Sequence, residues 1–521
     1  MPTTFEIHPA IGIARLGTSG EHFIGPEPDF PLDLRRRDSN GKLVRQSARF
    51  RVFQCERDTT GKLLDAIEIT TANARIEWSV HVVNRKGAAP RFLGDGRRNN
   101  AKGDDNLDKD LIIDPGEQSL SEPGNVLLDQ GRFMGKSVPL GQINMEPSGR
   151  LLVLGGFGNS ASIGSHPIDN FADNDEWHDD VSDGPVRARV RFASGQVVDA
   201  VPAWIIVTPP DFAPEITNLV TLYDVLQDLG VSRGILSAPT RISFEKHVRP
   251  ILERAMGYQW VNGQAREGFS SAAPFHGPGP GGHGPGGPGV FDLTTLSDPA
   301  LATTIRTRIF RLLRNPDGPS TPAIPPLKRM PRLNDENDSG DVFALTKLQY
   351  RAMQLWASGQ FLPTDPSDTQ TELLPDALTR MALEACAGGP FFPGIEAGRI
   401  LREPGRYFAN EPFRLTPAAL KPGEVTQGNA LPWQADYHLC RWEESDGGAP
   451  KKLGWWPAQR PDDVLKTASG TPIAWARGLA DQFESMVSNW HRLGFVKQDS
   501  SNPGVFIEQD RDPSLSETGS V

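Results

Sequence analysis

Residues 76–84 read IEWSVHVVN, and this stretch decides the fold class of the first half of the chain. Its apolar and polar residues alternate at a period of two, with Ile76, Trp78, Val80 and Val82 standing between Glu77, Ser79 and His81. Successive side chains of a β-strand point to opposite faces of a sheet, so this period is typical of a strand with one buried face. We therefore expect a strand here and a half-buried sheet around it.

Similar short segments lie on both sides of this strand. They are rich in Val, Ile, Phe and Trp, and Gly, Pro, Asn or Asp residues bound them, as is usual for strands. The segments are Phe5–Ala14, Ala48–Gln54, Arg75–Asn84, Leu151–Leu154, Val186–Phe192 and Trp204–Val207. Together they predict a β-rich N-terminal domain over residues 1–235.

The second half of the chain has a helical period instead. Apolar residues recur every three or four positions in LTKLQYRAMQLWASG, residues 345–359, and again over Asp376–Cys386. The longest apolar stripe is formed by Trp475, Leu479, Phe483, Met486, Val487 and Trp490. Residues 301–521 are therefore expected to form a mainly helical, loop-rich C-terminal domain, and the whole chain is expected to be an α+β protein.

A connecting region, residues 236–300, separates these two parts. It contains GPGPGGHGPGGPG, Gly277–Gly289, in which twelve of thirteen positions are Gly or Pro. Such a segment buries little apolar surface and supplies few backbone donors for a sheet, so we expect an exposed linker or loop.

Composition excludes several classes of protein. At 521 residues the chain is longer than the roughly 150 residues of a typical domain. Its 54 basic and 65 acidic residues give a formal net charge of −11 without a dense basic block, so we expect no nucleic-acid partner. Apolar runs such as Val201–Val207 are far shorter than a membrane span requires, and three cysteines do not make a disulfide framework. No secretory signal is visible, so the cytoplasm is the default location, with signal-independent export left open.

General motif searches find no established site. The chain has no phosphate loop, no G-x-S-x-G elbow, no C-x-x-C and no H-E-x-x-H, and Gly155–Ser160 (GGFGNS) is not a dinucleotide fingerprint. The acidic stretch Asp173–Gly184 lacks the ligand spacing of an EF-hand loop, so we expect a solvated turn there. The sequence therefore predicts no metal site.

A series of longer sequence motifs, in a fixed order, is more specific than these general motifs. They are HPAIGIARLGTS (8–19), ARFRVF (48–53), IEWSVHVVNRK (76–86), IDPG (113–116), GRLLVLGGFGNS (149–160), DDVSDGPV (179–186), WIIVTPPDFAP (204–214), CAGGPFFPGIE (386–396), LPWQADYHLC (431–440), WWPAQRPD (455–462) and MVSNWHRLGFV (486–496). In this order the chain resembles the L-lysine ε-oxidase and glycine oxidase family of cysteine tryptophylquinone quinoproteins. The resemblance covers nearly the whole chain, which is shorter than the better-known members.

The resemblance implies a cofactor made from the protein itself, in which an oxygenated tryptophan is joined to a cysteine sulfur. Cys440 matches the family's cross-linked cysteine, and Asp436 matches the carboxylate used in cofactor formation. Trp490, 50 residues after Cys440, is the preferred tryptophan, and Trp442, Trp455 and Trp456 are the alternatives. Because Trp490 ends the apolar stripe, its ring is expected to point inward. Each residue also has an ordinary interpretation, since tryptophan at helical spacing and intracellular cysteine are commonly core residues. Cys386 competes with Cys440 for the cross-link, and Cys55 is expected to be structural.

The implied activity is oxidative deamination of a primary amine or amino acid, with O2 consumed and H2O2 and ammonia released. Asp436 is the first candidate for the general base, and the alternative is a loop carboxylate that caps backbone amides. His438 and His491 stand beside the presumed cofactor residues. The family also implies a flavoprotein that matures the cofactor. The alternative function is a binding or partner protein that keeps the fold without forming the quinone. The sequence leaves open both the substrate and the oligomeric state, including a homo-oligomer.

Overall fold

The structure is a computed structural model of the chain. It describes residues 3–28, 35–59, 61–92, 94–99, 108–268, 293–318, 330–331, 344–369, 371–388, 396, 399–439, 441–444, 451–454 and 458–515. Cys440 and the Gly/Pro-rich stretch Gly277–Gly289 lie outside these residues, as do the side chains of Trp442, Trp455 and Trp456.

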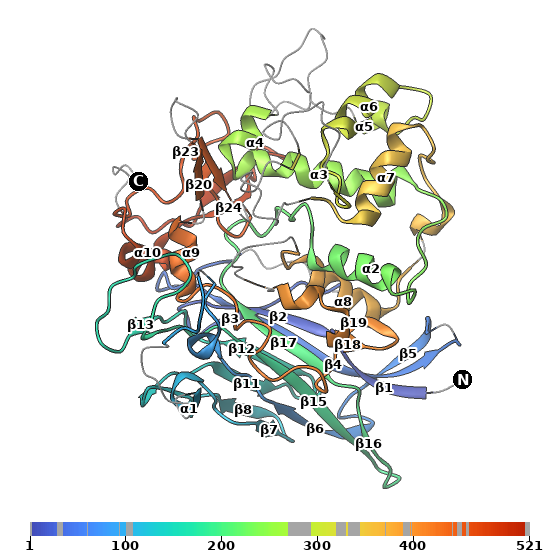
Figure 1. The fold of residues 1–521 in the computed structure, drawn as a ribbon. Coiled ribbons are helices and arrows are strands. Elements are labelled where there is room, and N and C mark those ends of the chain that lie inside the picture. The colour runs from blue at the N-terminus through green and yellow to red at the C-terminus, as the bar shows by residue number, and fades with distance from the viewer. Residues whose placement is uncertain are drawn as a thin grey trace.

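A mixed sheet of thirteen strands dominates the first half of the chain (Figure 1). Its main order is β7-β6-β15-β17-β2-β4-β12-β11-β8, with β1, β3 and β5 also paired to β4 and β16 paired to β15. The end strands β7 and β8 lie beside each other, so the sheet is strongly curved. Its strands are β1 (Thr3–His8), β2 (Ile11–Arg15), β3 (His22–Ile24), β4 (Arg45–Arg57), β5 (Leu63–Ile69), β6 (Ala74–Val80), β7 (Gln118–Leu120), β8 (Gly124–Leu127), β11 (Gly141–Met145), β12 (Leu151–Gly155), β15 (Ser182–Phe192), β16 (Val197–Asp199) and β17 (Ala203–Thr208).

The alternating stretch forms β6, as its period predicts. Ile76, Trp78 and Val80 are buried while Glu77 is exposed, and the strand pairs with β15. The predicted segment Phe5–Ala14, by contrast, is two strands, β1 and β2. Pro9 lies between them and has no amide hydrogen to donate to a sheet ladder.

The helices lie mainly in the second half of the chain and cover the upper side of the sheet in Figure 1. Helix α8 packs on β2, and α7 begins at a capping box formed by Thr346 and Gln349. The α-helices are α1 (Asp108–Leu111), α2 (Leu222–Ser232), α3 (Arg249–Gly257), α4 (Gly263–Gly268), α5 (Leu293–Leu296), α6 (Thr303–Leu312), α7 (Lys347–Ala357), α8 (Leu374–Glu384), α9 (Trp433–Leu439) and α10 (Phe483–Asn489).

Single helical turns and two-stranded sheets complete the described part. The turns are η1 (Lys86–Ala88), η3 (Phe244–Val248), η4 (Tyr258–Trp260), η6 (Pro366–Thr369), η7 (Arg399–Arg402), η8 (Pro404–Arg406) and η9 (Trp490–Arg492). The paired strands are β9 (Arg132–Phe133) with β10 (Lys136–Ser137), β13 (Ala161–Ser162) with β14 (Trp177–His178), β18 (Tyr407–Phe408) with β19 (Glu411–Leu415), β20 (Arg441–Glu444) with β21 (Lys451–Gly454), β22 (Asp463–Val464) with β23 (Ile473–Ala474), and β24 (Phe495–Gln498) with β25 (Phe506–Gln509).

One predicted helix is much shorter than its apolar stripe. Only α10 and the turn η9 are helical in the stretch Trp475–Trp490. Trp475 follows β23 and its amide donates to the Asp462 carbonyl, and Gly478 adopts a left-handed φ of 80°. The first residues of the stripe therefore lie in a turn, and their side chains are buried without a helix. The helix prediction is wrong for them.

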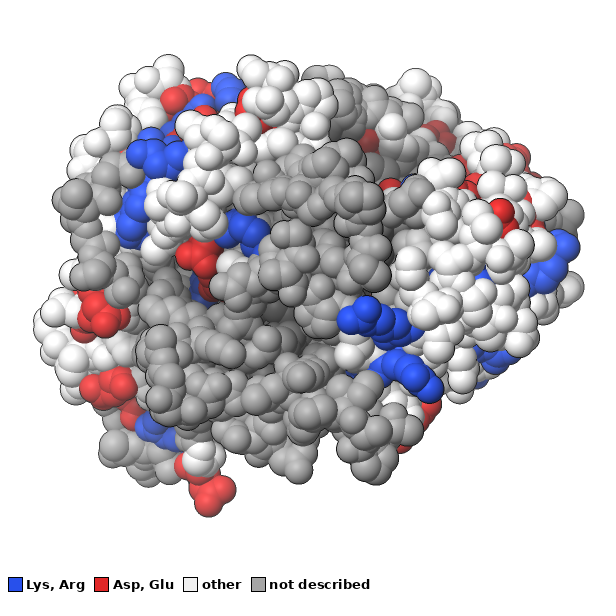
Figure 2. All heavy atoms as spheres, turned by 90° about the horizontal axis from the view of Figure 1, so that it is seen from above, with Lys and Arg blue, Asp and Glu red and all other residues white. Residues whose placement is uncertain are grey.

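The α+β class is confirmed: a β-rich first part precedes a more helical, loop-rich second part. One buried apolar cluster runs through both parts, because Val153 and Val207 of the sheet belong to it together with Trp433 and Trp490. Among the described helices, none combines the length and apolar character needed to cross a membrane. On the face seen in Figure 2, the described acidic and basic side chains are intermixed.

Candidate active site

Three carboxylates from the acidic stretch lie buried between the sheet and the C-terminal half. Asp179, Asp180 and Asp183 are 0 %, 1 % and 0 % exposed. The prediction of a solvated turn over Asp173–Gly184 is therefore wrong. The stretch includes β14 and the start of β15: Asp179 and Asp180 lie in the short link between these strands, and Asp183 lies in β15.

Asp179 connects the sheet to helix α9. Its Oδ2 accepts a hydrogen bond from Lys86 Nζ at 2.7 Å and from the Trp433 amide at 3.1 Å, and its Oδ1 accepts one from Asn84 Nδ2 at 2.9 Å. Lys86 also donates to the Ala430 carbonyl at 2.8 Å. Burial lowers the pKa of Lys86, and the charge of Asp179 opposes that shift. The first residue of α9 is thus held by a buried ion pair.

Asp183 makes a second connection between the sheet and the C-terminal half of the chain. It accepts from the Thr426 amide and hydroxyl at 2.8 and 2.7 Å, and from Trp204 Nε1 at 3.0 Å. Burial raises the pKa of Asp183 to about 6, although these hydrogen bonds favour its charged form.

Helix α9 carries the predicted carboxylate Asp436. Asp436 is fully buried, three positions after Trp433. The next residue, Tyr437, is also buried and donates its hydroxyl to the Pro210 carbonyl at 2.7 Å. The rings of Trp433 and Tyr437 meet edge to face, with centroids 4.9 Å apart. Aromatic rings therefore surround this part of the helix.

Trp490 lies in η9, immediately after α10, and is 2 % exposed. Helices α9 and α10 lie side by side (Figure 1), and the Trp490 ring meets the Trp433 ring at 5.1 Å and 70°. The ring of His491 lies edge to face with Trp490 at 5.7 Å. The predicted inward direction of Trp490 is confirmed by this burial.

The loop after β12, residues 155–160, covers one edge of the Trp490 ring. Gly158 has a left-handed φ of 71°, and a Cβ atom added there would lie 2.2 Å from Cζ2 and 2.7 Å from Cη2 of Trp490. Gln434 of α9 donates to the Gly158 carbonyl at 3.1 Å, and Ser160 donates to Gln434 Oε1 at 2.7 Å. The loop, α9 and Trp490 therefore form one packed unit, here called the tryptophan slot.

The structure brings some of the predicted residues together and leaves others undescribed. Asp436 and Trp490 are linked through Trp433, which is on the helix of the first and in contact with the ring of the second. Cys440 directly follows α9 but lies outside the described residues, so its link to Trp490 stays a prediction. His438 contacts Asp481 and the Phe483 ring.

The two other cysteines are buried thiols. Cys386 is 0 % exposed, and its Sγ lies 3.7 Å from the Ala387 carbonyl. Burial, together with the charge of Glu396, raises its pKa well above the ordinary value. Cys55 belongs to β4, where burial raises the pKa of the thiol to about 12. Neither environment favours a reactive thiolate.

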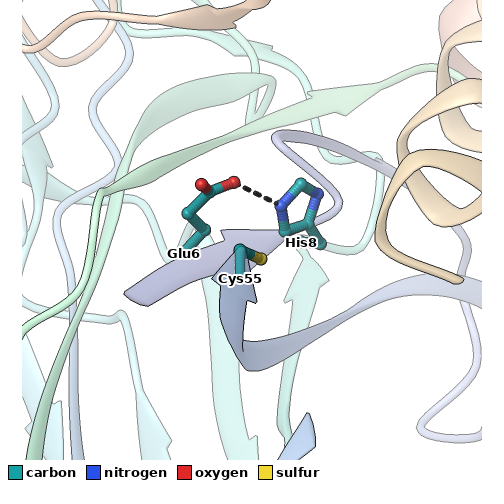
Figure 3. A group of neighbouring side chains, drawn as sticks. All are labelled: Glu6, His8 and Cys55. Atoms are coloured by element: carbon teal, nitrogen blue, oxygen red, sulfur yellow. Dashed lines mark hydrogen bonds and ion pairs between the residues drawn. The ribbon is translucent and has the colours of Figure 1, made fainter. Parts of the chain in front are cut away.

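The ligand atoms of Glu6, His8 and Cys55 lie within 4.8 Å of one another (Figure 3). Arg57 donates to both Glu6 oxygens at 2.9 and 2.7 Å, His8 Nε2 donates to Glu6 at 3.1 Å, and Arg414 lies 3.5 Å from the same carboxylate. Burial would raise the pKa of Glu6, but hydrogen bonds from Arg57 and His8 and the charge of Arg414 hold it well below its usual range. Two guanidinium groups therefore already occupy the place of a cation, and the cluster is organised as an ion-pair network.

A cavity of about 240 Å³ lies near the aromatic neighbours of the slot. Pro210, whose carbonyl accepts the Tyr437 hydroxyl, lines it, and so does Phe495, which stacks on Phe212. Its charged lining residues are Arg15, Arg36, Asp211, Arg254 and Glu384. This lining suits a small charged molecule, although Trp490 is not part of it.

Sequence reasoning missed Trp433 and Gly158 as neighbours of Trp490, and it missed the burial of Asp179 and Asp180. Two signals were present. The motifs GGFGNS and DDVSDGPV are among those that carry the family resemblance, although neither is a general ligand motif. The apolar Val181, in the middle of the acidic stretch, was a further sign of burial.

The fold and the slot together define a class: a two-part α+β protein whose buried tryptophan is enclosed by elements of both parts. Comparison with known proteins is more specific. Residues 8–207 match the L-lysine epsilon oxidase N-terminal family model, and residues 328–463 match the model of the L-lysine epsilon oxidase C-terminal domain. The two matches cover more than half of the chain in the expected order, and the chain belongs to the L-lysine epsilon oxidase family.

Individual relatives agree with this assignment. The L-lysine 6-oxidase of Marinomonas mediterranea is 25% identical over 686 aligned positions, covering 98% of this chain and 90% of the relative. The solved ε-lysine oxidase of Marinomonas mediterranea has a TM-score of 0.77 at 22% identity, covering 98% of this chain and 95% of the other. A further structure, the Schiff base intermediate of that oxidase with L-Lys, has a TM-score of 0.76 with the same identity and coverage. These structures share the fold of this chain.

Proposed function

We propose that this protein oxidises the primary amine of an amino acid with a cysteine tryptophylquinone formed from Cys440 and Trp490. The observation that carries the proposal is the packing of the buried Trp490 ring against α9, the helix that ends at the residue before Cys440. A cross-link between the two residues requires such proximity. Membership of the L-lysine epsilon oxidase family supports the same reaction class.

The surroundings of Trp490 fit an oxygenated ring. Gly158, without a side chain, faces Cζ2 and Cη2, which are adjacent carbons of the six-membered ring. The indole N–H of Trp433 is buried and has no hydrogen-bond acceptor among the described residues. An oxygen on the neighbouring ring would be a suitable acceptor, since buried donors are rarely left unpaired.

The reaction balances without a further co-reactant. The amine loses two electrons and two protons, one proton from the α-carbon and one from the nitrogen; O2 takes them up as H2O2, water supplies the carbonyl oxygen and ammonia leaves. When formed, the quinone supplies an electrophilic carbonyl that binds the amine and accepts its electrons.

The remaining tasks fall to side chains of this chain. We assign proton transfer to the Asp436 carboxylate, because it is buried on the helix that packs against Trp490 and a general base must lie near the reacting centre. Trp433 and Tyr437 exclude water around it. His491, whose ring is in contact with Trp490, is assigned to orient the substrate or oxygen.

Intact mass spectrometry after co-expression with the maturation flavoprotein tests the proposal. The expected mass shows two oxygen atoms gained and hydrogen lost, with a peptide linking Cys440 to Trp490. Cys440→Ala and Trp490→Phe should each abolish visible absorbance and peroxide release with L-lysine and other amino acids. Trp356→Phe, which removes another fully buried tryptophan, is the matched control and should stay coloured.

The outcomes separate the alternatives. An unmodified mass would favour a binding or partner protein without a quinone. Loss of colour in Cys386→Ala together with its persistence in Cys440→Ala would transfer the cross-link to Cys386, and colour in Trp490→Phe would transfer it to Trp442, Trp455 or Trp456.

A further inference from the structure

The loop of residues 155–160 is held between a buried carboxylate and the Trp490 ring. On one side, Asp180 Oδ2 accepts the Asn159 amide at 3.0 Å, and the backbone of Phe157 is a further donor to this carboxylate. On the other side, Gly158 faces the Trp490 ring edge. The residue that touches the indole therefore lies between two amides that Asp180 accepts.

The loop lies too close to both neighbours to accept a side chain at Gly156 or Gly158. A Cβ atom added at Gly156 would lie 2.4 Å from Asp180 Oδ2, and one added at Gly158 would lie 2.2 Å from Trp490 Cζ2. Arg45 also fixes the loop, because it donates to the Gly155 carbonyl at 3.0 Å and its guanidinium lies 4.4 Å from the Phe157 ring centroid. Residues 157–159 therefore connect Asp180 to the Trp490 ring.

Asp180 is 1 % exposed, and its Oδ1 has no hydrogen-bond partner among the described residues. The charged groups that act on it are Asp179 from the same stretch, Arg45 from β4 and Lys86 from η1. Burial raises the pKa of Asp180 to about 7, with a further contribution from Asp179, while the Asn159 and Phe157 amides act in the opposite direction. Both charge states are thus populated near neutral pH.

We propose that Asp180 is a positioning residue, whose charged form holds the loop so that Gly158 stays against the Cζ2–Cη2 edge of Trp490. The proposal rests on the proposed function in one respect: Trp490 must be the ring that becomes the quinone. A carboxylate accepts backbone amides more strongly than a neutral carboxylic acid does. Protonation of Asp180 therefore loosens the loop and changes the surroundings of the ring edge. Asparagine would keep an acceptor oxygen but not the charge or the titration.

Hydrogen exchange tests the loop contact without the quinone. In the unmatured protein, amides of residues 156–160 should exchange about tenfold faster in Asp180→Ala than in the wild type, with partial rescue in Asp180→Asn. Asp376→Asn is the matched control, because burial raises the pKa of Asp376 to about 6 but its helix, α8, does not carry the loop. Unchanged loop protection in Asp180→Ala would overturn the proposal.

The matured enzyme gives the second readout. Its visible absorbance maximum should shift with a midpoint near pH 7, and this shift should vanish in Asp180→Asn and persist in Asp376→Asn. An unchanged midpoint in Asp180→Asn would refute the positioning role. A wild-type protein that stays colourless with an unmodified mass would instead refute the proposed function, and the exchange experiment would still decide whether Asp180 holds the loop.

Discussion

At the scale of single residues, the slot depends on groups that sequence patterns do not connect. The burial of Trp490 was predictable, because the residue ends an apolar stripe. Its contact with Gly158 was not, because periodicity describes only neighbours in the chain, and this contact joins positions 158 and 490. The motifs that carry the family resemblance contain both Gly158 and Trp490, but they do not indicate that the two residues are in contact.

Gly158→Ala tests this contact. The new methyl group would overlap the Trp490 ring and would require a left-handed φ, so we expect a loss of about 2–4 kcal/mol in the free energy of unfolding and loss of quinone colour. Urea denaturation and visible absorbance measure the two effects. Gly428→Ala is the control, since a Cβ atom there meets nothing within 4 Å and the glycine has no left-handed φ. Equal stability of both variants would contradict the close approach.

Asp180 also makes stability depend on pH. Its pKa is about 7 in the folded protein and near the ordinary 3.8 in the unfolded chain, so the folded state binds the proton more tightly. Stability from this group is therefore present below about pH 4 and is lost as the pH rises toward 7, by on the order of 4 kcal/mol. Asp180→Asn does not titrate.

The difference in unfolding free energy between Asp180→Asn and the wild type should consequently increase in favour of the variant from pH 4 to 7 and then level off. Urea denaturation at several pH values measures it. A difference that stays constant with pH would show that Asp180 does not carry the shifted pKa.

At the scale of elements, local sequence patterns predicted the strands and helices that depend mainly on neighbouring residues. The alternation of β6 and the capped stripe of α7 both follow from the chain itself. The pairing order of the curved sheet did not, because strands such as β2 and β17 meet across long stretches of chain. The stripe from Trp475 was misleading, since a turn can bury the same residues at the same spacing.

Gly478→Ala distinguishes a turn from a helix by the sign of its effect. In a helix, alanine would be more stable than glycine by roughly 1 kcal/mol. Gly478 instead has a φ of 80°, so alanine should destabilise the protein by about 1 kcal/mol. The free energy of unfolding from urea titration gives the sign, and a stabilised variant would restore the helix prediction.

At the scale of the whole molecule, buried charges join the β-rich part to the C-terminal half. Acidic side chains are ordinarily exposed to solvent, and without a metal-ligand spacing the stretch Asp173–Gly184 gave no sign of a buried partner. Asp179 is buried because Lys86 and the amide of Trp433 meet it there. The arrangement depends on partners that are distant in sequence, so composition could not predict it.

Lys86→Met tests whether the buried ion pair between Lys86 and Asp179 holds the two halves of the chain together. It leaves the Asp179 carboxylate buried without its cation, and we expect a loss of about 3–5 kcal/mol in the free energy of unfolding. Arg75→Met is the control, because its ion pair with Glu122 is exposed and should contribute little. Chemical denaturation compares the variants, and similar midpoints would mean that the buried pair does not hold the halves together.

The tryptophan slot is lined by residues 155–160 and 433–437, and the ring that it encloses is that of Trp490. During synthesis the indole emerges from the ribosome after both of these segments, so its enclosure needs parts of the chain that are made at different times. If Trp490 carries the proposed quinone, a maturing flavoprotein therefore meets the enclosed ring only after all three segments have been made. A copy in which these segments fail to assemble would remain colourless and make no peroxide, so visible colour would report that the slot has formed.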